Sequence, residues 1–327
     1  MKRILTKLLD LFFLLRFPLL APVWTIFLVG YITGNEACRI GGVFYNADLY
    51  KSVLHAWIIL SGFSLVVASI YVVNQIADIE SDRINHKLFI LPNGFVSIKT
   101  AWILASVCAL SGLLIALAYS KVLLILFSLS LVLGYCYNLS PVSLKNRPIG
   151  GVTANALGHG MIAFLTGWYS VHPFDSFSLP LFIQAVISSL SPSFANGAVF
   201  LATTVPDAEG DRSTGKVTFC VKYGEKTTAT ASAVLCVVAL ITSFFMLYNA
   251  WIMIATSLVS VIFFIYFAFT TKKEYAFRAF KWPVFLLSAA VVLFQPEYGV
   301  LIILTFFGSR LYYKWRFNIE YPTFKAQ

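Results

Sequence analysis

Charged residues are scarce in this sequence. Only 12% of its 327 residues are charged and only 14 are acidic, whereas 59% are hydrophobic. A soluble globular domain carries about 25% charged residues. This deficit argues against a water-soluble fold, and the long apolar runs predict an all-α, polytopic membrane helical bundle. We expect a single transmembrane domain over residues 1–327.

Paired metal-ligating cysteines are also missing. The five cysteines lie mostly in or beside apolar segments and show no paired spacing, which is typical of cysteine used as a small apolar residue. The net charge of +10 does not indicate nucleic acid, because the basic residues fall in short clusters between apolar runs, where orientation in the bilayer explains them. We expect membrane lipid, and no nucleic acid, as a partner.

Ten apolar segments approach the length of about 20 residues that a spanning helix needs. They are residues 10–33, 53–78, 98–119, 122–138, 149–170, 179–205, 227–247, 249–270, 279–294 and 298–315. The ninth is short and is followed by Gln295-Pro296-Glu297. The sequence therefore predicts nine or ten transmembrane helices around a central cavity.

The basic residues favour ten crossings. With ten, only Arg39, Lys51 and Lys121 of the 24 Lys and Arg residues fall on one side, Arg16 lies inside the first span, and the rest share the other side. Because positive loops face the cytosol, both termini are predicted to be cytosolic. The second and sixth spans then end on that same side.

Two acidic stretches end these two spans. Asn74, Asp78 and Asp82 follow one another at intervals of four residues, as do Asp207 and Asp211, so each set lies on one helical face. Acidic residues at helix C-termini are disfavoured by about 0.3 to 1 kcal/mol each, and clustered carboxylates repel one another. The pattern indicates a bound cation, and oxygen ligands without cysteine or paired histidine favour Mg²⁺.

A substrate phosphate is the expected partner of such a site, since Mg²⁺ held by few carboxylates keeps positions for phosphate oxygens. The basic residues around the predicted mouth can neutralise phosphate; they are Arg83, Lys87, Lys145, Arg147, Arg212 and Lys216. Lys145 and Arg147 are favoured because they follow a compact segment that begins at Tyr135. A phosphate bound at the mouth of an apolar bundle implies a hydrocarbon chain on the same ligand.

The motifs closely resemble those of the UbiA-type intramembrane prenyltransferases. Asn-x-x-x-Asp-x-x-x-Asp after the second span, Asp-x-x-x-Asp after the sixth, and the loop with Tyr137 and Lys145 after the fourth occur in the family's order. The resemblance covers nearly the whole chain. It implies Mg²⁺-dependent transfer of a polyprenyl group from a prenyl diphosphate to an aromatic or lipid-like hydrophobic acceptor, with release of diphosphate. The family usually has nine spans, whereas the charge pattern here favours ten.

The resemblance also assigns roles to residues. It implies Asp78, Asp82, Asp207 and Asp211 as catalytic residues that bind Mg²⁺ together with Asn74, and Asn74, Arg83, Tyr137, Lys145 and Arg147 as substrate-binding residues. Arg16 is included as a substrate-binding candidate, with a simple reach to the membrane interface as the alternative. His159 is interpreted as a hydrogen-bonded residue of the bundle rather than as the acceptor's base.

Three alternatives are open. An inactive family member that serves as a binding or scaffolding subunit would be expected to have lost part of these motifs, and none is lost. A UbiA-like terpene cyclase would use the same metal site and quench the cation within its own hydrocarbon. A transporter or ion-binding protein would explain polar residues in the spans. It would not explain two acidic motifs on the same side of the membrane, surrounded by lysines and arginines that can donate to phosphate. The sequence therefore favours an integral membrane, multi-pass enzyme with a cytosolic active-site mouth.

Overall fold

The computed structural model describes residues 2–36, 38, 47–84, 90–171, 173–174 and 177–322. Its helices are α1 (Lys2–Leu14), α2 (Phe17–Gly34), α3 (Ala47–Ala77), α4 (Ile79–Ile84), α5 (Ile98–Tyr119), α6 (Lys121–Asn138), η1 (Leu144–Asn146), α7 (Pro148–Asn155), η2 (Ala156–Ile162), α8 (Ala163–Tyr169), α9 (Leu179–Ser213), α10 (Phe219–Tyr223), α11 (Glu225–Ser243), α12 (Trp251–Thr270), α13 (Lys273–Val292) and α14 (Pro296–Phe317). No strand occurs among these residues, which confirms the all-α prediction.

Eight helices of this described part are long and apolar enough to cross a membrane: α2, α3, α5, α6, α9, α11, α12 and α13. The run from α7 through the π-helix η2 to α8 fills the predicted fifth span, and α14 fills the predicted tenth. The weakest predicted segment, 279–294, lies largely within α13, a candidate span. The number of crossings stays a prediction.

The predicted first span, 10–33, is wrong at its start. The helix breaks between Leu14 and Phe17, where Arg16 has a φ of 57°. Pro18 explains the break, because a proline ring clashes with the carbonyl four residues earlier, here that of Leu14, the last residue of α1. A new helix then begins with proline in its first turn, where the missing N–H costs nothing.

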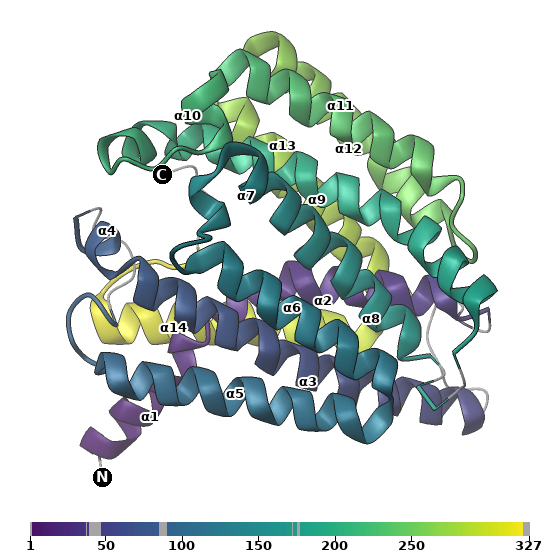
Figure 1. Ribbon diagram of the computed structural model, residues 1–327, viewed down its shortest axis with the longest axis horizontal. Coiled ribbons are helices and arrows are strands. Elements are labelled where there is room, and N and C mark those ends of the chain that lie inside the picture. The colour runs from purple at the N-terminus through teal and green to yellow at the C-terminus, as the bar shows by residue number, and fades with distance from the viewer. Residues whose placement is uncertain are drawn as a thin grey trace.

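Two groups of helices pack on either side of α2 and α8. Helices α3, α5 and α6 contact one another, as do α9, α11, α12 and α13, while α2 contacts members of both groups. In Figure 1 the first group lies below and the second above, and α1, α4 and α10 lie toward the left end of the bundle. Helix α14 is tied to α1 at Asp10, which accepts hydrogen bonds from Tyr312 at 2.6 Å and from Arg316 at 3.0 Å.

Close packing of α2 on α8 depends on two glycines. A Cβ atom at Gly30 would overlap the Phe164 carbonyl oxygen, and one at Gly167 would overlap the Phe27 carbonyl oxygen. Small residues let helix backbones approach in this way, and the contact then gains dispersion energy along both helices.

We expect Gly167→Ala to destabilise the protein by about 1 to 3 kcal/mol, the usual cost of overpacking. The overlap is with backbone, which cannot rotate away. Thermal unfolding in detergent measures the effect, and Gly308→Ala is the matched control because nothing lies within 4 Å of its added Cβ. Equal midpoints for the two variants would show that α2 and α8 do not pack as closely as described.

Candidate functional site

The first acidic motif lies at the junction of α3 and α4. Helical hydrogen bonds continue through the junction, from the Asp78 amide to the Asn74 carbonyl at 3.0 Å and from the Asp82 amide to the Asp78 carbonyl at 2.8 Å. Asn74, Asp78 and Asp82 therefore keep the helical spacing that the sequence predicts. The Asn74 amide nitrogen donates to Asp78 Oδ2 at 3.1 Å, which orients that carboxylate.

Asp78 binds two lysines from distant segments. Its Oδ1 lies 2.9 Å from Lys145 Nζ and 3.3 Å from Lys216 Nζ. Lys145 is in η1, between α6 and α7, and Lys216 follows α9. The side chains of Asp78 and Lys145 are 15% and 11% exposed, so this ion pair is largely screened from water. Three segments thus meet at one carboxylate.

Lys145 and Lys216 are held close together beside Asp78. Burial lowers the pKa of Lys145 below its ordinary value, the nearby Asp78 carboxylate raises it, and the neighbouring Lys216 lowers it further. The Asp82 carboxylate also raises the pKa of Lys145, so the two lysines share this site with more than one carboxylate. Partly desolvated lysines of this kind can bind phosphate oxygens, because desolvated charges interact more strongly than exposed ones.

The second acidic motif lies in the last turns of α9. Asp207 is exposed and Asp211 is half-buried. Asp211 is close to the first motif, since the Asp78 and Asp211 carboxylates both act electrostatically on the Tyr137 hydroxyl. Among the described residues, no group of three His, Cys, Asp or Glu side chains could hold a metal ion. The donors are nevertheless all oxygen, which suits Mg²⁺ when phosphate oxygens complete its coordination.

Two of the other predicted phosphate-binding residues, Arg83 and Arg147, have partners outside the acidic motifs. Arg83 pairs with Glu80 at 2.9 Å, with its side chain 55% exposed, and Arg147 donates to the Pro141 carbonyl at 3.4 Å. Arg212 is exposed, and Lys87 lies outside the described residues. Roles for Arg83 and Arg147 in binding diphosphate stay predictions, and in the structure neither is paired with an acidic motif residue.

A cavity of about 430 Å³ is connected to these ion pairs through Asn74, which lines it and donates to Asp78. Its volume is within the range typical of ligand sites. Its polar lining includes Arg16, Asn74, Tyr137, Asn138 and His159, and the rest is mostly apolar, from α2, α3, α6 and α9. The Arg16 guanidinium donates to Asn74 Oδ1 at 3.4 Å. The sequence-predicted Arg16, Asn74 and Tyr137 thus share one cavity.

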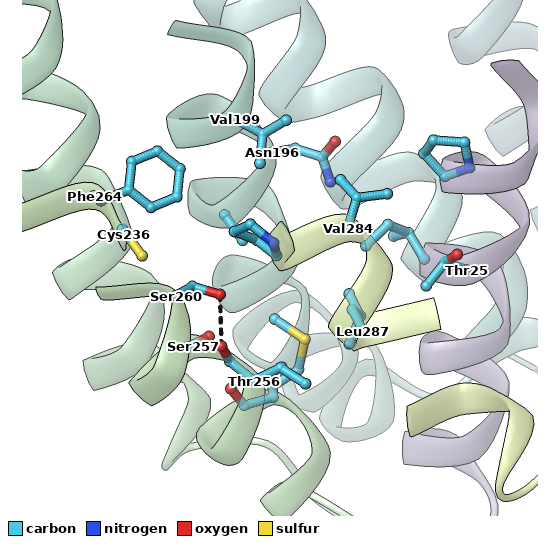
Figure 2. Close-up of a pocket in the computed structure, with 15 residues that line it drawn as sticks. Thr25, Asn196, Val199, Cys236, Thr256, Ser257, Ser260, Phe264, Val284 and Leu287 are labelled. Carbon is cyan, nitrogen blue, oxygen red and sulfur yellow. Dashed lines mark hydrogen bonds between the residues drawn. The ribbon is translucent and has the colours of Figure 1, made fainter. Parts of the chain in front are cut away.

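A smaller cavity of about 50 Å³ adjoins the larger one and shares Pro22, Asn196 and Val199 with it. Figure 2 shows Asn196 and Val199 above this space, with Ser257 and Ser260 of α12 below. Its volume is close to that of one or two water molecules, each of which takes about 30 Å³ of liquid. It is therefore too small to be the substrate site.

Two functional candidates were missed or undervalued by sequence reasoning. Asn138 accepts a hydrogen bond from the Asn74 amide at 2.7 Å, and Lys216 pairs with Asp78. Asn138 directly follows Tyr137 at the end of an apolar run, which is a usable signal. Lys216 could not be told from its basic neighbours, because only the turn after α9 brings it to Asp78.

Known proteins similar to this chain agree with the fold and with the family that the motifs resemble. The model of the UbiA prenyltransferase family matches residues 37–290. Digeranylgeranylglyceryl phosphate synthase from Sulfolobus acidocaldarius is 32% identical over 165 residues, which are 50% of this chain and 56% of that protein. Probable homogentisate phytyltransferase 2 from Oryza sativa subsp. japonica is 27% identical over 186 residues, 54% of this chain and 48% of that protein.

The chain spans about half the length of these curated relatives. Among solved structures, a UbiA homolog from Archaeoglobus fulgidus bound to GPP and Mg²⁺ has a TM-score of 0.62 at 16% identity, covering 88% of this chain and 99% of that one. At this identity the likeness establishes the fold alone.

Proposed function

Because the chain belongs to the UbiA prenyltransferase family, we propose that it is an intramembrane enzyme that transfers a polyprenyl group from a prenyl diphosphate to a hydrophobic acceptor. The observation that carries the proposal is the pairing of Asp78 with Lys145 and Lys216 at the mouth of a mostly apolar cavity of about 430 Å³. The mouth suits a diphosphate and the cavity suits its hydrocarbon chain.

The two lysines bind the diphosphate and orient it. Lys145 and Lys216 donate to its oxygens in place of Asp78, and the charge that develops on the leaving group is stabilised without reorganisation of water. Asn74, Asp78, Asp82, Asp207 and Asp211 are the residues proposed to hold Mg²⁺. When bound, Mg²⁺ neutralises diphosphate oxygens and so helps the carbon–oxygen bond to break.

The cavity walls protect the reacting prenyl carbon. Leu19, Val67, Ile70, Leu133 and Val199 are among the apolar residues that line the cavity. Water there would capture a cationic allyl fragment, so an apolar enclosure favours transfer to the acceptor over hydrolysis. Tyr137 lies between the mouth and the cavity, where its hydroxyl can meet the junction of diphosphate and prenyl chain.

The acceptor, the extent of the domain and its orientation in the membrane are part of the same proposed enzyme. The acceptor is aromatic or lipid-like, in keeping with relatives named for homogentisate and for digeranylgeranylglyceryl phosphate. The whole of residues 1–327 forms one transmembrane domain, with both termini and the active-site mouth cytosolic, as the distribution of basic residues favours. Arg16 contributes positive charge to the cavity in which the acceptor binds.

The direct test uses the full chain reconstituted in lipid vesicles with Mg²⁺. Labelled prenyl diphosphates of several lengths are incubated with a panel of phenolic and glycerol-based acceptors, and diphosphate release and product mass are followed. Acceptor-dependent release of diphosphate is expected, and removal of Mg²⁺ with a chelator should abolish it. A hydrocarbon product formed without acceptor would indicate the terpene cyclase instead, and absence of both binding and turnover would refute the proposal.

A further inference from the structure

A row of polar side chains in contact with one another runs along the cavity wall. The Tyr137 hydroxyl bonds to the Asn155 side chain, Asn155 Oδ1 lies 3.1 Å from His159 Nδ1, and His159 Nε2 lies 3.3 Å from the Tyr71 hydroxyl. All four side chains line the central cavity. His159 is thus at once a hydrogen-bonded residue of the bundle and a titratable group that faces the substrate space.

The backbone around His159 is unusual. His159 lies in the π-helix η2, a wide turn that is rare and is found frequently at functional sites. The Ser193 hydroxyl of α9 donates to the Ala156 carbonyl at 2.9 Å. A Cβ at Gly160 would come within 2.5 Å of the Ser193 Cα, so glycine is needed there. Contacts with α9 therefore hold the π-helix and its histidine in place.

The hydrogen bonds assign the tautomer of His159. The Asn155 amide nitrogen donates to the Gly151 carbonyl at 3.0 Å, which leaves Oδ1 facing His159. Because Oδ1 carries no hydrogen, the proton of the neutral imidazole is on Nδ1, and Nε2 has a lone pair.

The Nε2 lone pair is open to a ligand. Among the described residues, the Tyr71 hydroxyl is the hydrogen-bond neighbour of Nε2, and it has one hydrogen for two acceptors, the Leu19 carbonyl at 3.0 Å and Nε2 at 3.3 Å. When this hydrogen goes to the nearer Leu19 carbonyl, the Nε2 lone pair is left to accept from a ligand. A base with its lone pair in a cavity and its other nitrogen oriented by a fixed acceptor has the arrangement that general base catalysis requires.

We propose that His159 is the general base of the transfer reaction and that the acceptor presents a hydroxyl group to its Nε2, an inference that rests on the proposed prenyl transfer. The prenyl carbon–oxygen bond breaks and diphosphate leaves with the electron pair. The acceptor forms the new bond to the prenyl carbon, and its hydroxyl proton moves to Nε2. In an alcohol the oxygen forms this bond. In a phenol the conjugated ring carbon forms it, and the hydrogen of that carbon then moves to the oxygen.

Arg16 supports this assignment by its charge. It lines the same cavity, contacts Asn74, and acts electrostatically on Tyr71. Positive charge beside Tyr71 stabilises the oxyanion that forms as the hydroxyl loses its proton. The acceptor hydroxyl is therefore placed between a base and a cation.

The test compares His159→Gln with His55→Gln in the reconstituted full chain. His55 Nδ1 also bonds to a tyrosine hydroxyl, that of Tyr119, at 3.2 Å, but His55 lies about 24 Å from Tyr71 along α3 at 1.5 Å per residue. We expect His159→Gln to bind labelled prenyl diphosphate within about twofold of the unmodified protein and to transfer it about 100-fold more slowly, the lower range for a general base. His55→Gln should transfer at the unmodified rate.

Chemical rescue separates a base from a packing residue. Imidazole added to His159→Ala should restore transfer, whereas pyrrole, a ring of the same size without a basic nitrogen, should not. Parallel reactions with phenolic and with glycerol-based acceptors show whether the acceptor hydroxyl belongs to a phenol or to an alcohol. The O-methyl ether of the acceptor that reacts should not be prenylated. Transfer by His159→Gln at the unmodified rate, equal rescue by pyrrole, or prenylation of the ether would each overturn the inference. Failure of the unmodified protein to turn over any prenyl diphosphate would instead overturn the proposed function.

Discussion

Replacing Asp78 with asparagine is expected to lower kcat/KM for prenyl transfer by about a thousandfold, equivalent to about 4 kcal/mol of transition-state stabilisation. The amide preserves the size and the neutral hydrogen bonds of the side chain but removes the charge that faces Lys145 and Lys216. It also removes an anionic ligand proposed for Mg²⁺. The measurement is the initial rate of diphosphate release in vesicles at saturating Mg²⁺.

Two further variants show whether this effect is catalytic. Glu80→Gln is the matched control, since Glu80 lies two residues away with its side chain 77% exposed, and it should retain full activity. Removing the Asp78 charge alone breaks its largely buried pair with Lys145, and breaking a buried ion pair typically costs about 3 to 5 kcal/mol of stability. The double variant Asp78→Asn/Lys145→Met should recover that stability and stay inactive. Activity of Asp78→Asn within tenfold of the unmodified protein would contradict the assigned role.

Lys145→Met should lower kcat/KM about 500-fold, because methionine fills the same volume but gives the diphosphate neither charge nor hydrogen-bond donor. Removal of one preorganised hydrogen-bond donor that stabilises the charge developing on a leaving group lowers the rate by a factor of about 10² to 10³. Lys145→Arg should recover much of the loss, since it keeps the charge. Rates at varied prenyl diphosphate concentration separate the effect on KM from that on kcat.

Activity of Arg83→Met tests whether the cations that bind diphosphate are those paired with Asp78 in the structure or all those near the motifs in the sequence. Arg83 pairs with the exposed Glu80, and an exposed pair contributes about 0.2 to 1 kcal/mol, so Arg83→Met should change kcat/KM by less than about fivefold. Lys273→Met is a lysine control, because Lys273 pairs with exposed Glu209 at 3.6 Å. Equal losses of kcat/KM for Lys145→Met and Arg83→Met would show that the diphosphate is bound by all the basic residues near the motifs rather than by those paired with Asp78.

Most of the helical architecture follows from hydropathy and breaker residues. Apolar runs of the right length predicted the spans, and even the short segment 279–294 lies largely in the helix Lys273–Val292. The break before Phe17 was overlooked, although Pro18 signals it. The π-helix around His159 has no such signal, because its wide turn depends on the contacts of Ala156 and Gly160 with α9.

The candidate site was only partly predictable for a similar reason. Spacing of four residues places Asn74, Asp78 and Asp82 on one helical face whatever surrounds them. Helical spacing does not indicate which of the basic residues pairs with Asp78. Lys145, Lys216 and Arg83 are alike in sequence, yet in the described part of the chain Lys145 and Lys216 pair with Asp78 whereas Arg83 pairs with Glu80, because the loop after α6 and the turn after α9 fold over the end of α3.

By itself the sequence determined what depends on local periodicity and on transfer from water to lipid: a membrane-spanning helical protein, two acidic stripes, and oxygen donors suited to Mg²⁺ and phosphate. The tertiary structure alone decided which cations face Asp78 and where the cavity lies. It also decided that Asn155 orients His159, which lines the cavity. These features join residues that are far apart in the chain, and the packing angles and loop paths that bring them together leave no periodic trace in the sequence.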